Sequence, residues 1–461
     1  MKARTGFIWA ISANVANAAL WAIVIPVSSR YLGAEETAIW LNFVVMAGVG
    51  QLLELGFNPT LARSFSYVYA GAQSLRAVGL DESHGPVNHP LLAQLIFSSR
   101  KIYYIVGALS AATLWGGGTL YLLNVLPPGT PADGVLTAWL IYSSGCVISL
   151  WFGYTNSMIL GHGDVNFYNQ TLVLTRGLQL AVSIGALVAG GGLACLALGA
   201  LGSAIVGRAI CYRHVRAELQ CAHAIGPLAS DINALVRVLW HNSGRYGLVM
   251  LGAFLITRAN LLIAGLTIGV VPAAGYSFSV QVLTFLQSLA GVPFSMKLPV
   301  LNTLWARQQR REAEDMFAAA LALGIVMFIV GAAGFVTIGP FALAQIKGNL
   351  ILPDTWILLA MSLIFLFELN HGNCANLLTI SNKVPFVTAA LVTGLMIVIG
   401  SWIVAPHFGV LGLVMVVGMS QLSFNNWVWP RAACSMLNTT YSRLLKQGFS
   451  LLVDRAKKYR S

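Results

Sequence analysis

Long apolar segments alternate with short polar gaps along the whole chain. Twelve of these segments approach the ~20 apolar residues that a helix needs to cross the hydrocarbon core of a bilayer. They cover residues 8–29, 38–58, 102–126, 135–160, 170–190, 193–212, 246–268, 273–300, 316–338, 355–378, 386–404 and 409–430. The pattern therefore predicts an all-α integral membrane protein with about twelve transmembrane helices.

The Lys and Arg residues orient these helices. Of the 27 in the chain, 22 fall in the two terminal tails and in every second gap, including the five from Arg208 to Arg245. The opposite gaps hold only Arg30 and Lys347. The positive-inside rule therefore places both termini in the cytoplasm. The net charge of +12 lies in these cytoplasmic segments, so we expect anionic membrane lipids as partners and no nucleic acid.

An internal repeat indicates two similar halves. Residues 32–53 align with 268–289 without a gap, and Gly33 then meets Gly269 while Gln51 meets Gln287. Two helical bundles of the same orientation around a central cavity are a transporter architecture. We expect a six-helix bundle over 1–215, a cytoplasmic linker with an amphipathic segment over 216–245, a second six-helix bundle over 246–430, and a basic cytoplasmic tail over 431–461.

The sequence lacks the usual signatures of an enzyme. It has no Gly-rich phosphate loop, no acidic pair for a metal ion and no nucleophile elbow. The six Cys residues have no metal-ligand spacing, and we expect them to be reduced. These features favour a transporter with no metal site and no cofactor other than a coupling H⁺ or Na⁺.

Charged residues inside the predicted helices are candidates for function. An ionisable group at the bilayer centre costs about 2.5–3.5 kcal/mol even on the lenient insertion scale. Arg258 lies about halfway along its segment, so it either meets an anionic ligand or pairs with Glu368, the only comparably deep acid. Arg63, Lys297 and Arg176 lie nearer to segment ends, where snorkelling to the headgroups is the alternative to ligand binding.

Two acidic positions are candidates for ion coupling. Glu368 and His371 are three residues apart and therefore share one helical face, which favours either a proton or cation relay or interhelical hydrogen bonding. Glu54 lies near the cytoplasmic end of its segment, before Pro59, where we expect the helix to stop.

About 50 residues near the N-terminus carry a resemblance to a known family. They read Ser29-Arg30-Tyr31-Leu32-Gly33, then Trp40, then Leu53-Glu54-Leu55-Gly56-Phe57-Asn58-Pro59-Thr60 with Arg63, and then Tyr69-Ala70-Gly71-Ala72-Gln73-Ser74-Leu75. This stretch resembles the O-antigen and polysaccharide repeat-unit flippases of the multidrug/oligosaccharidyl-lipid/polysaccharide (MOP) exporter superfamily. Thr257-Arg258-Ala259-Asn260 departs from the Asp-Arg pair that family members often show, which leaves the cation without the acid.

The resemblance implies a MOP fold, related to that of the MATE transporters, in a bacterial inner membrane. It also implies flipping of undecaprenyl-pyrophosphate-linked glycans to the periplasmic leaflet by ion-coupled alternating access, with polysaccharide polymerase and chain-length proteins as partners. The expected cationic cavity is formed by Arg258, Arg63, Lys297, Arg30, Arg176 and Asn260, and the expected ion-coupling residues are Glu54, Glu368 and His371.

Three other functions stay open from the sequence. One is a cation-coupled multidrug exporter of the same superfamily, which would need more buried acids than bases. Another is a flippase for peptidoglycan precursors. The third is a membrane-embedded acyl- or glycosyltransferase that uses His371 and Glu368 as its base.

Overall fold

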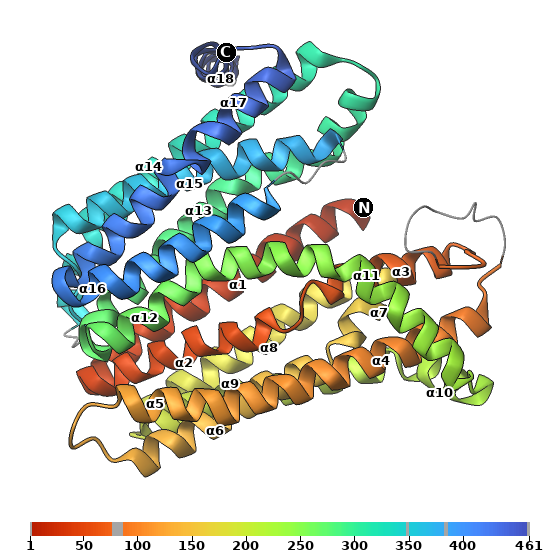
Figure 1. Cartoon of the computed structure of the whole chain (residues 1–461), viewed down its shortest axis with the longest axis horizontal. Coiled ribbons are helices and arrows are strands. Elements are labelled where there is room, and N and C mark those ends of the chain that lie inside the picture. The colour runs from red at the N-terminus through yellow and green to blue at the C-terminus, as the bar shows by residue number, and fades with distance from the viewer. Residues whose placement is uncertain (1, 76–85, 347–349, 382–385, 459–461) are drawn as a thin grey trace. The chain divides into compact units, whose positions relative to one another are not determined.

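Helices form nearly all of the described structure. The computed structural model describes residues 2–75, 86–346, 350–381 and 386–458 (Figure 1), and within these ranges no β-strand occurs. In this part of the chain nine helices are long and apolar enough to cross a membrane, or ten if the bent pair of α2 and α3 is one span. Each of the twelve expected ranges falls on one helix or on two or three consecutive helices. The expected all-α membrane fold is thus confirmed.

The chain divides into two compact units. The N-terminal unit comprises Met1–Phe254 and Gly269–Val271, and the C-terminal unit comprises Leu255–Ile268 and Pro272–Ser461. The first division therefore falls at the end of α11, inside the range 246–268 that the sequence predicts as one span.

In the N-terminal unit, α8 packs against both α1 and α9, while α6 packs against α9. Gly145 on α6 allows this approach, because a Cβ atom there would lie 3.1 Å from the Cα atom of Leu201. The helices of this unit are α1 (Lys2–Tyr31), α2 (Ala34–Leu52), α3 (Phe57–Tyr69), α4 (His89–Ala111), η1 (Ala112–Gly118), α5 (Thr119–Val125), α6 (Ala132–Trp151), α7 (Tyr154–His162), α8 (Val165–Val188), α9 (Gly192–His214), α10 (Arg216–Ile225) and α11 (Ala229–Phe254).

A break separates α2 from α3, which are bent by 45°. Leu55 (φ 48°) and Gly56 (φ 70°) both adopt left-handed backbone conformations there, which is uncommon for a residue such as leucine. Pro59 was expected to end α2, but it lies in the first turn of α3. Proline is tolerated there because the N–H groups of a first turn have no intrahelical partner. The break itself holds Glu54.

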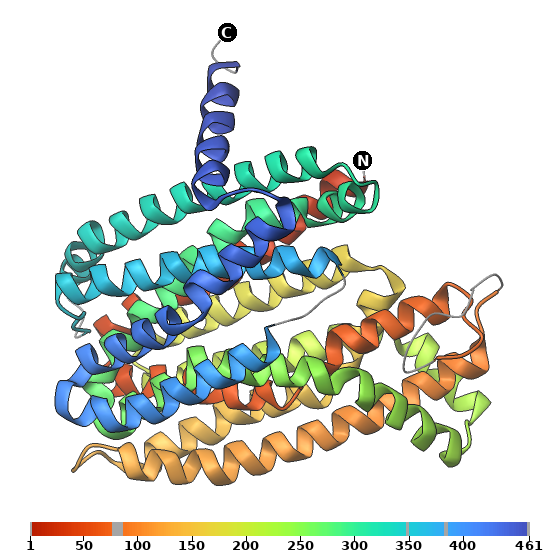
Figure 2. The same ribbon diagram turned by 45° about the horizontal axis from the view of Figure 1, so that its top comes forward.

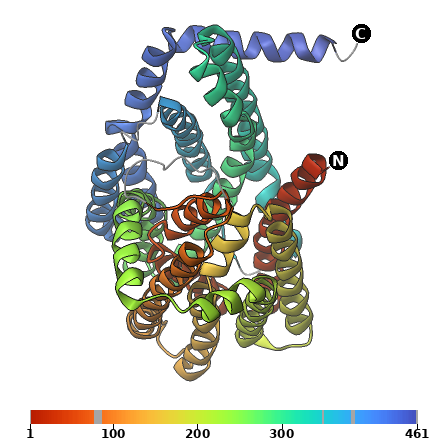
Figure 3. The ribbon, with the colours of Figure 1, turned by 90° about the vertical axis from the view of Figure 1, so that its right-hand side faces the viewer.

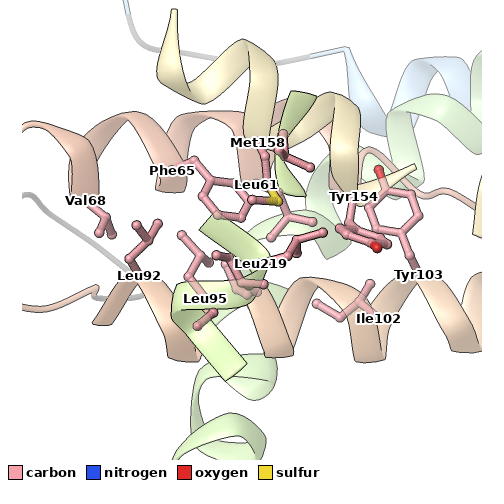
Figure 4. Packing of buried hydrophobic residues seen from close by; sticks show 14 of the residues in the cluster. Leu61, Phe65, Val68, Leu92, Leu95, Ile102, Tyr103, Tyr154, Met158 and Leu219 are labelled. Carbon is pink, nitrogen blue, oxygen red and sulfur yellow. The ribbon is translucent and has the colours of Figure 1, made fainter. Parts of the chain in front are cut away.

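A hydrophobic cluster fixes the helices that surround this break. Figure 4 shows Leu61 and Phe65 of α3 packed against Leu95 of α4 and Met158 of α7, and all four side chains are fully buried. Tyr103 of α4 lies at one edge of the same cluster. Its phenol is therefore held by packing on a rigid part of the unit.

The C-terminal unit is built around four long helices, α13 to α16. Gly409 interrupts α16 with φ 57° and ψ −138°, three residues after Pro406, so this helix holds two of the expected spans. The elements of this unit are η2 (Leu255–Ala259), α12 (Asn260–Thr267), α13 (Val270–Ala306), α14 (Arg310–Ile346), α15 (Thr355–Leu378), η3 (Thr379–Ser381), α16 (Val387–Ser423), α17 (Asn425–Leu437) and α18 (Tyr441–Lys458).

The C-terminal helix α18 runs across the other helices of its unit. It is seen end-on in Figure 1 and from the side in Figures 2 and 3, where it projects beyond α14. Gly448 packs against the backbone of Ala318 on α14, and the side chain of Gln447 donates a hydrogen bond to Asp315 on the same helix. The exposed face of α18 carries Phe449 and Val453. The basic tail expected over 431–461 is thus largely helical in its described part.

Candidate functional site

A polar cavity of about 360 Å³ lies inside the N-terminal unit. It is enclosed by α2, α3, α6, α7, α8 and α9 together with the break that follows α2. Its polar lining comprises Gln51, Glu54, Asn58, Tyr142, Ser149, Asn156, Tyr168, Thr171, Thr175, Arg176, Gln179, Ser203 and Arg208. A volume in this range is typical of small-molecule sites.

The carboxylate of Glu54 faces this cavity from the break between α2 and α3. It accepts a hydrogen bond of 2.6 Å from the phenol of Tyr103 on α4. Gly153 leaves room for the phenol ring of Tyr103, because a Cβ atom at that position would collide with the ring. A backbone break and a packed aromatic ring together position this acid.

Two arginines supply positive charge to the same cavity. Arg176 on α8 donates from Nη1 to Oε1 of Gln179, three residues along the helix, at 2.9 Å. Its Nε atom and the Nη1 atom of Arg208 on α9 are buried and have no hydrogen-bond partner among the described residues. Both guanidinium groups therefore have N–H donors available for an anion.

The remainder of the lining is neutral and rich in hydrogen-bonding groups. Asn58 accepts a bond of 2.9 Å from Ser157, while Asn156, Tyr142 and Tyr168 contribute amide and phenol groups. Amides, hydroxyls and tyrosine rings are suited to polar ligands such as sugars, because they donate, accept and offer flat apolar faces. The cavity thus combines two cations and one acid with a neutral polar wall.

The C-terminal unit holds the half-buried acid Glu368 in a different environment. Glu368 on α15 accepts a hydrogen bond of 2.7 Å from the amide of Gln421 on α16. Asn425 continues the network by donating to Gln421 at 2.8 Å and to Thr393 at 3.0 Å. The Nδ1 atom of His371 lies 2.7 Å from Oδ1 of Asn426 on α17. Glu368 and His371 share a helix as expected, but each bonds to a different neighbouring element.

Two other predicted site residues lie where α12 begins. Arg258 is half-buried on η2, a π-helical turn, and such turns occur frequently at functional sites. Asn260 is buried and donates from Nδ2 to the phenol of Tyr276 at 2.8 Å. Its Oδ1 atom has no partner among the described residues.

Three predicted cations lie on exposed surfaces. Arg63 on α3 and Lys297 on α13 are exposed, and neither lines the polar cavity of the N-terminal unit. Arg30 is exposed at the end of α1, with its guanidinium carbon 5.9 Å from the ring centroid of Tyr31. Of the six residues predicted for a cationic cavity, only Arg176 lines this one.

Arg208 is the functional candidate that the sequence reading assigned to a cytoplasmic gap. Arg208 lies within the predicted segment 193–212, and helix α9, which ends at His214, places it in the lining of the polar cavity. No proline or turn signal occurs between Gly202 and Arg208, so the continuation of the helix was readable. The charge of Arg208 was taken as a sign of the membrane boundary, although it marks a polar interior.

Within the described residues, no group of three or more His, Cys, Asp or Glu side chains is arranged to hold a metal ion. All six cysteines are free, and Cys146 and Cys211 line the polar cavity.

Known structures with the same fold are membrane transporters. An inward-facing multidrug resistance MATE family transporter of the MOP superfamily has a TM-score of 0.70 and 15% identity over 91% of this chain and 95% of its own. Lipid II flippase MurJ in an inward closed conformation has a TM-score of 0.64 and 12% identity over 97% of this chain and 91% of its own. An outward-facing MATE transporter has a TM-score of 0.57 and 14% identity over 95% and 96% of the two chains.

No family model and no curated protein matches the sequence. The structural likeness nevertheless extends over nearly the whole chain, so the chain has the fold of MOP superfamily transporters. This confirms the fold that the N-terminal resemblance implies.

Proposed function

We propose that this protein is a membrane transporter that flips an oligosaccharide on a lipid pyrophosphate carrier from the cytoplasmic to the periplasmic leaflet of a bacterial inner membrane. The observation that carries the proposal is the pair of arginines in the N-terminal cavity, Arg176 and Arg208, each with a buried N–H donor that has no partner in the described part of the chain. The substrate class corresponds to the O-antigen and related surface polysaccharides.

The charges of Arg176 and Arg208 are costly inside a membrane. An arginine inside a membrane span is unfavourable by about 2.5–3.5 kcal/mol unless an anion or water compensates it. Guanidinium groups match the oxygens of phosphate geometrically, and such charge-assisted bonds are about twice as strong as neutral ones. A pyrophosphate group would use the free donors of Arg176 and Arg208, and the neutral amides and tyrosines would contact the first sugars.

The other predicted cations have supporting roles in this proposal. Within the C-terminal unit, Arg258 on its π-helical turn is a second candidate contact for a phosphate group, and Asn260, whose Oδ1 has no partner among the described residues, is a candidate contact for a sugar hydroxyl. The exposed Arg63 and Lys297 attract the anionic headgroup toward the transporter, because surface charges steer association more than they stabilise it. Arg30 lies in one of the opposite gaps, where it would meet the headgroup after the crossing.

We assign ion coupling to the half-buried carboxylates of Glu54 and Glu368. Inward movement of H⁺ or Na⁺ bound at Glu54 or Glu368, with His371 as a neighbouring proton carrier, would return the transporter to its starting state. Both termini are cytoplasmic in this arrangement, and a polymerase and a chain-length regulator receive the flipped unit.

A multidrug exporter is the second candidate, and the fold likeness to MATE transporters favours it. Organic cations need acids that are not neutralised nearby. The N-terminal cavity has the opposite balance, with two arginines and one glutamate among its charged lining residues. An anionic substrate therefore fits the cavity better than a cationic drug.

Deletion of the gene in its own host tests the proposed function. We expect the complete lipid-linked repeat unit to accumulate in the cytoplasmic leaflet while surface polysaccharide is lost. Complementation with Arg208→Gln should fail, whereas the matched Arg213→Gln, exposed on the same helix, should restore polysaccharide. Normal polysaccharide in the deletion strain would contradict the proposal, and a truncated glycan would indicate a membrane enzyme instead.

A further inference from the structure

A second, larger hollow lies in the C-terminal unit, separate from the polar cavity of the N-terminal unit. This groove has a volume of about 950 Å³ and is enclosed by α14, α15, α17 and the start of α18. Its size is at the upper end of the range of about 300–1,000 Å³ for small-molecule sites. We call it the α18 groove.

Apolar and polar side chains both line the α18 groove. Leu366 and Phe367 of α15 and Trp427 at the start of α17 form an apolar wall, whereas Ser435, Thr439 and Thr440 lie toward the other end of α17 and the start of α18. The eight residue steps from Trp427 to Ser435 span about 12 Å of helix. A lining of this length with both kinds of side chain matches an amphipathic molecule that is longer than a simple polar ligand.

One positive charge and one free hydroxyl occur among the residues that line the groove. Arg431 is the one arginine or lysine among the described residues that line the groove, and its guanidinium carbon lies 5.7 Å from the ring centroid of Trp427. Arginine and tryptophan side chains are typical of the headgroup level of a membrane. The buried Oγ1 atom of Thr439 has no hydrogen-bond partner among the described residues.

The start of α18 adds backbone N–H donors near the groove. Thr440 precedes the helix, and its Oγ1 atom accepts a bond of 3.4 Å from the amide of Arg443. The earlier amides of the helix, from Tyr441 onward, have no intrahelical acceptor and form its positive end. Together with Arg431 and Thr439, they form a set of donors that suits a phosphate group.

The exposed side of α18 indicates which phosphate compound is nearby. Arg443 and Lys446 are exposed on this helix beside the exposed apolar residues Phe449 and Val453. A basic amphipathic helix of this kind lies at the surface of a membrane with anionic lipids. The groove therefore opens where glycerophospholipids are concentrated.

We propose that the α18 groove is a binding site for one anionic glycerophospholipid, with its phosphate at Arg431 and Thr439 and an acyl chain along Leu366 and Phe367. Its binding holds α17 and the start of α18 together. The site does not depend on the proposed transport substrate.

Native mass spectrometry of the purified full-length protein with equimolar dioleoylphosphatidylglycerol and dioleoylphosphatidylcholine tests this proposal. The two lipids share their acyl chains, so a difference reports on the headgroup. We expect the anionic lipid to be retained about tenfold better, which corresponds to one charge-assisted contact. Arg431→Gln should remove the preference, while the control Arg443→Gln, outside the groove lining, should keep it.

Two further variants separate the parts of the site. Thr439→Val should weaken the preference without affecting the apolar wall, and Leu366→Trp should reduce retention of both lipids by filling the groove. Equal retention of the two lipids by the wild-type protein would overturn the proposal, as would an equal loss in Arg431→Gln and Arg443→Gln. Displacement of the anionic lipid by equimolar farnesyl phosphate would assign the groove to a prenyl phosphate instead.

Discussion

The two units each hold a half-buried glutamate that accepts a hydrogen bond from a neighbouring helix, and the surroundings of these two acids differ in kind. In the N-terminal unit, Glu54 lies at a break between helices and shares its cavity with Arg176 and Arg208. In the C-terminal unit, Glu368 lies within a continuous helix and accepts from the amide of Gln421. One acid is set among cations with free donors, and the other among neutral amides that bond to one another.

This difference separates two uses of polarity inside a membrane. An amide network satisfies its own donors and acceptors, so it stabilises helix contacts and needs no ligand. Guanidinium groups with unpartnered N–H donors leave charge uncompensated, and a ligand or water must complete them. The N-terminal cavity is therefore the stronger candidate for an anion site, whereas Glu368 is suited to an exchange of protons or ions.

The largest effect is expected from removing one cation of the N-terminal cavity. Arg208→Gln should weaken binding of inorganic pyrophosphate by about 10- to 100-fold, the range for loss of a charge-assisted hydrogen bond. Isothermal titration calorimetry of the purified protein measures this effect, with Arg213→Gln as the exposed control. Equal binding by Arg208→Gln and the wild-type protein would contradict the assignment of an anion site to the N-terminal cavity.

A somewhat smaller effect is expected from moving the ring that holds Glu54. Gly153→Ala places a methyl group against Tyr103, and overpacking of this kind costs about 1–3 kcal/mol. The midpoint of thermal unfolding should fall. Gly177→Ala on α8 is the matched control, because nothing lies within 4 Å of a Cβ atom at that position. If both variants unfold at the wild-type temperature, Tyr103 is not rigidly held.

Neutralising the two acids should sharpen the contrast between the units. Glu54→Gln removes negative charge from a cavity that contains two arginines, so pyrophosphate affinity should rise by up to about tenfold. Glu368→Gln should leave this affinity within about twofold of the wild-type value, since its unit contributes no residue to that cavity. A rise of the same size in both variants would indicate a general charge effect.

The smallest effect concerns an acid outside the spans. Asp164, between α7 and α8, is 3.0 Å from Nε2 of His214 and 3.1 Å from Nδ1 of His162. The hydrogen bond from His214, followed by that from His162, lowers the pKa of Asp164 below its usual value near 3.8. The ionised form therefore stabilises the fold above that pH, and this contribution is lost as the pH falls through the lowered pKa.

Asp164→Asn should consequently unfold at a slightly lower temperature than the wild-type protein at pH 6. The loss in free energy of unfolding should be less than about 1 kcal/mol, because the site is partly exposed. The difference from the wild-type protein should shrink once the pH drops below the usual value near 3.8. Melting curves of both proteins across this pH range test the assignment. A difference that grows toward acidic pH would contradict it.

The sequence predicted the membrane fold well because hydropathy and charge act over whole segments. The breaks were harder to predict. Proline was expected to end α2 at Pro59, yet the chain leaves the helix at Leu53 and uses left-handed conformations at Leu55 and Gly56. A leucine in that conformation has no signature in the sequence, since tertiary packing imposes it.

Site residues were predicted less completely because depth along a helix does not say which way a side chain faces. Arg176 was singled out and lines the N-terminal cavity, while Arg63 and Lys297 were singled out and are exposed. Arg208 was assigned to a gap because its charge marks the usual end of a span. The structure places Arg208 on α9 beside α8, where it lines the N-terminal cavity.

The most direct test of the account is transport in proteoliposomes. Purified protein would be reconstituted with a prenyl-pyrophosphate oligosaccharide, and the fraction of glycan that becomes accessible to an external lectin would be measured over time. We expect flipping by the wild-type protein and by Arg213→Gln, and a loss of at least about tenfold in Arg208→Gln. Flipping at the wild-type rate by Arg208→Gln would contradict the proposal that the N-terminal cavity binds the pyrophosphate.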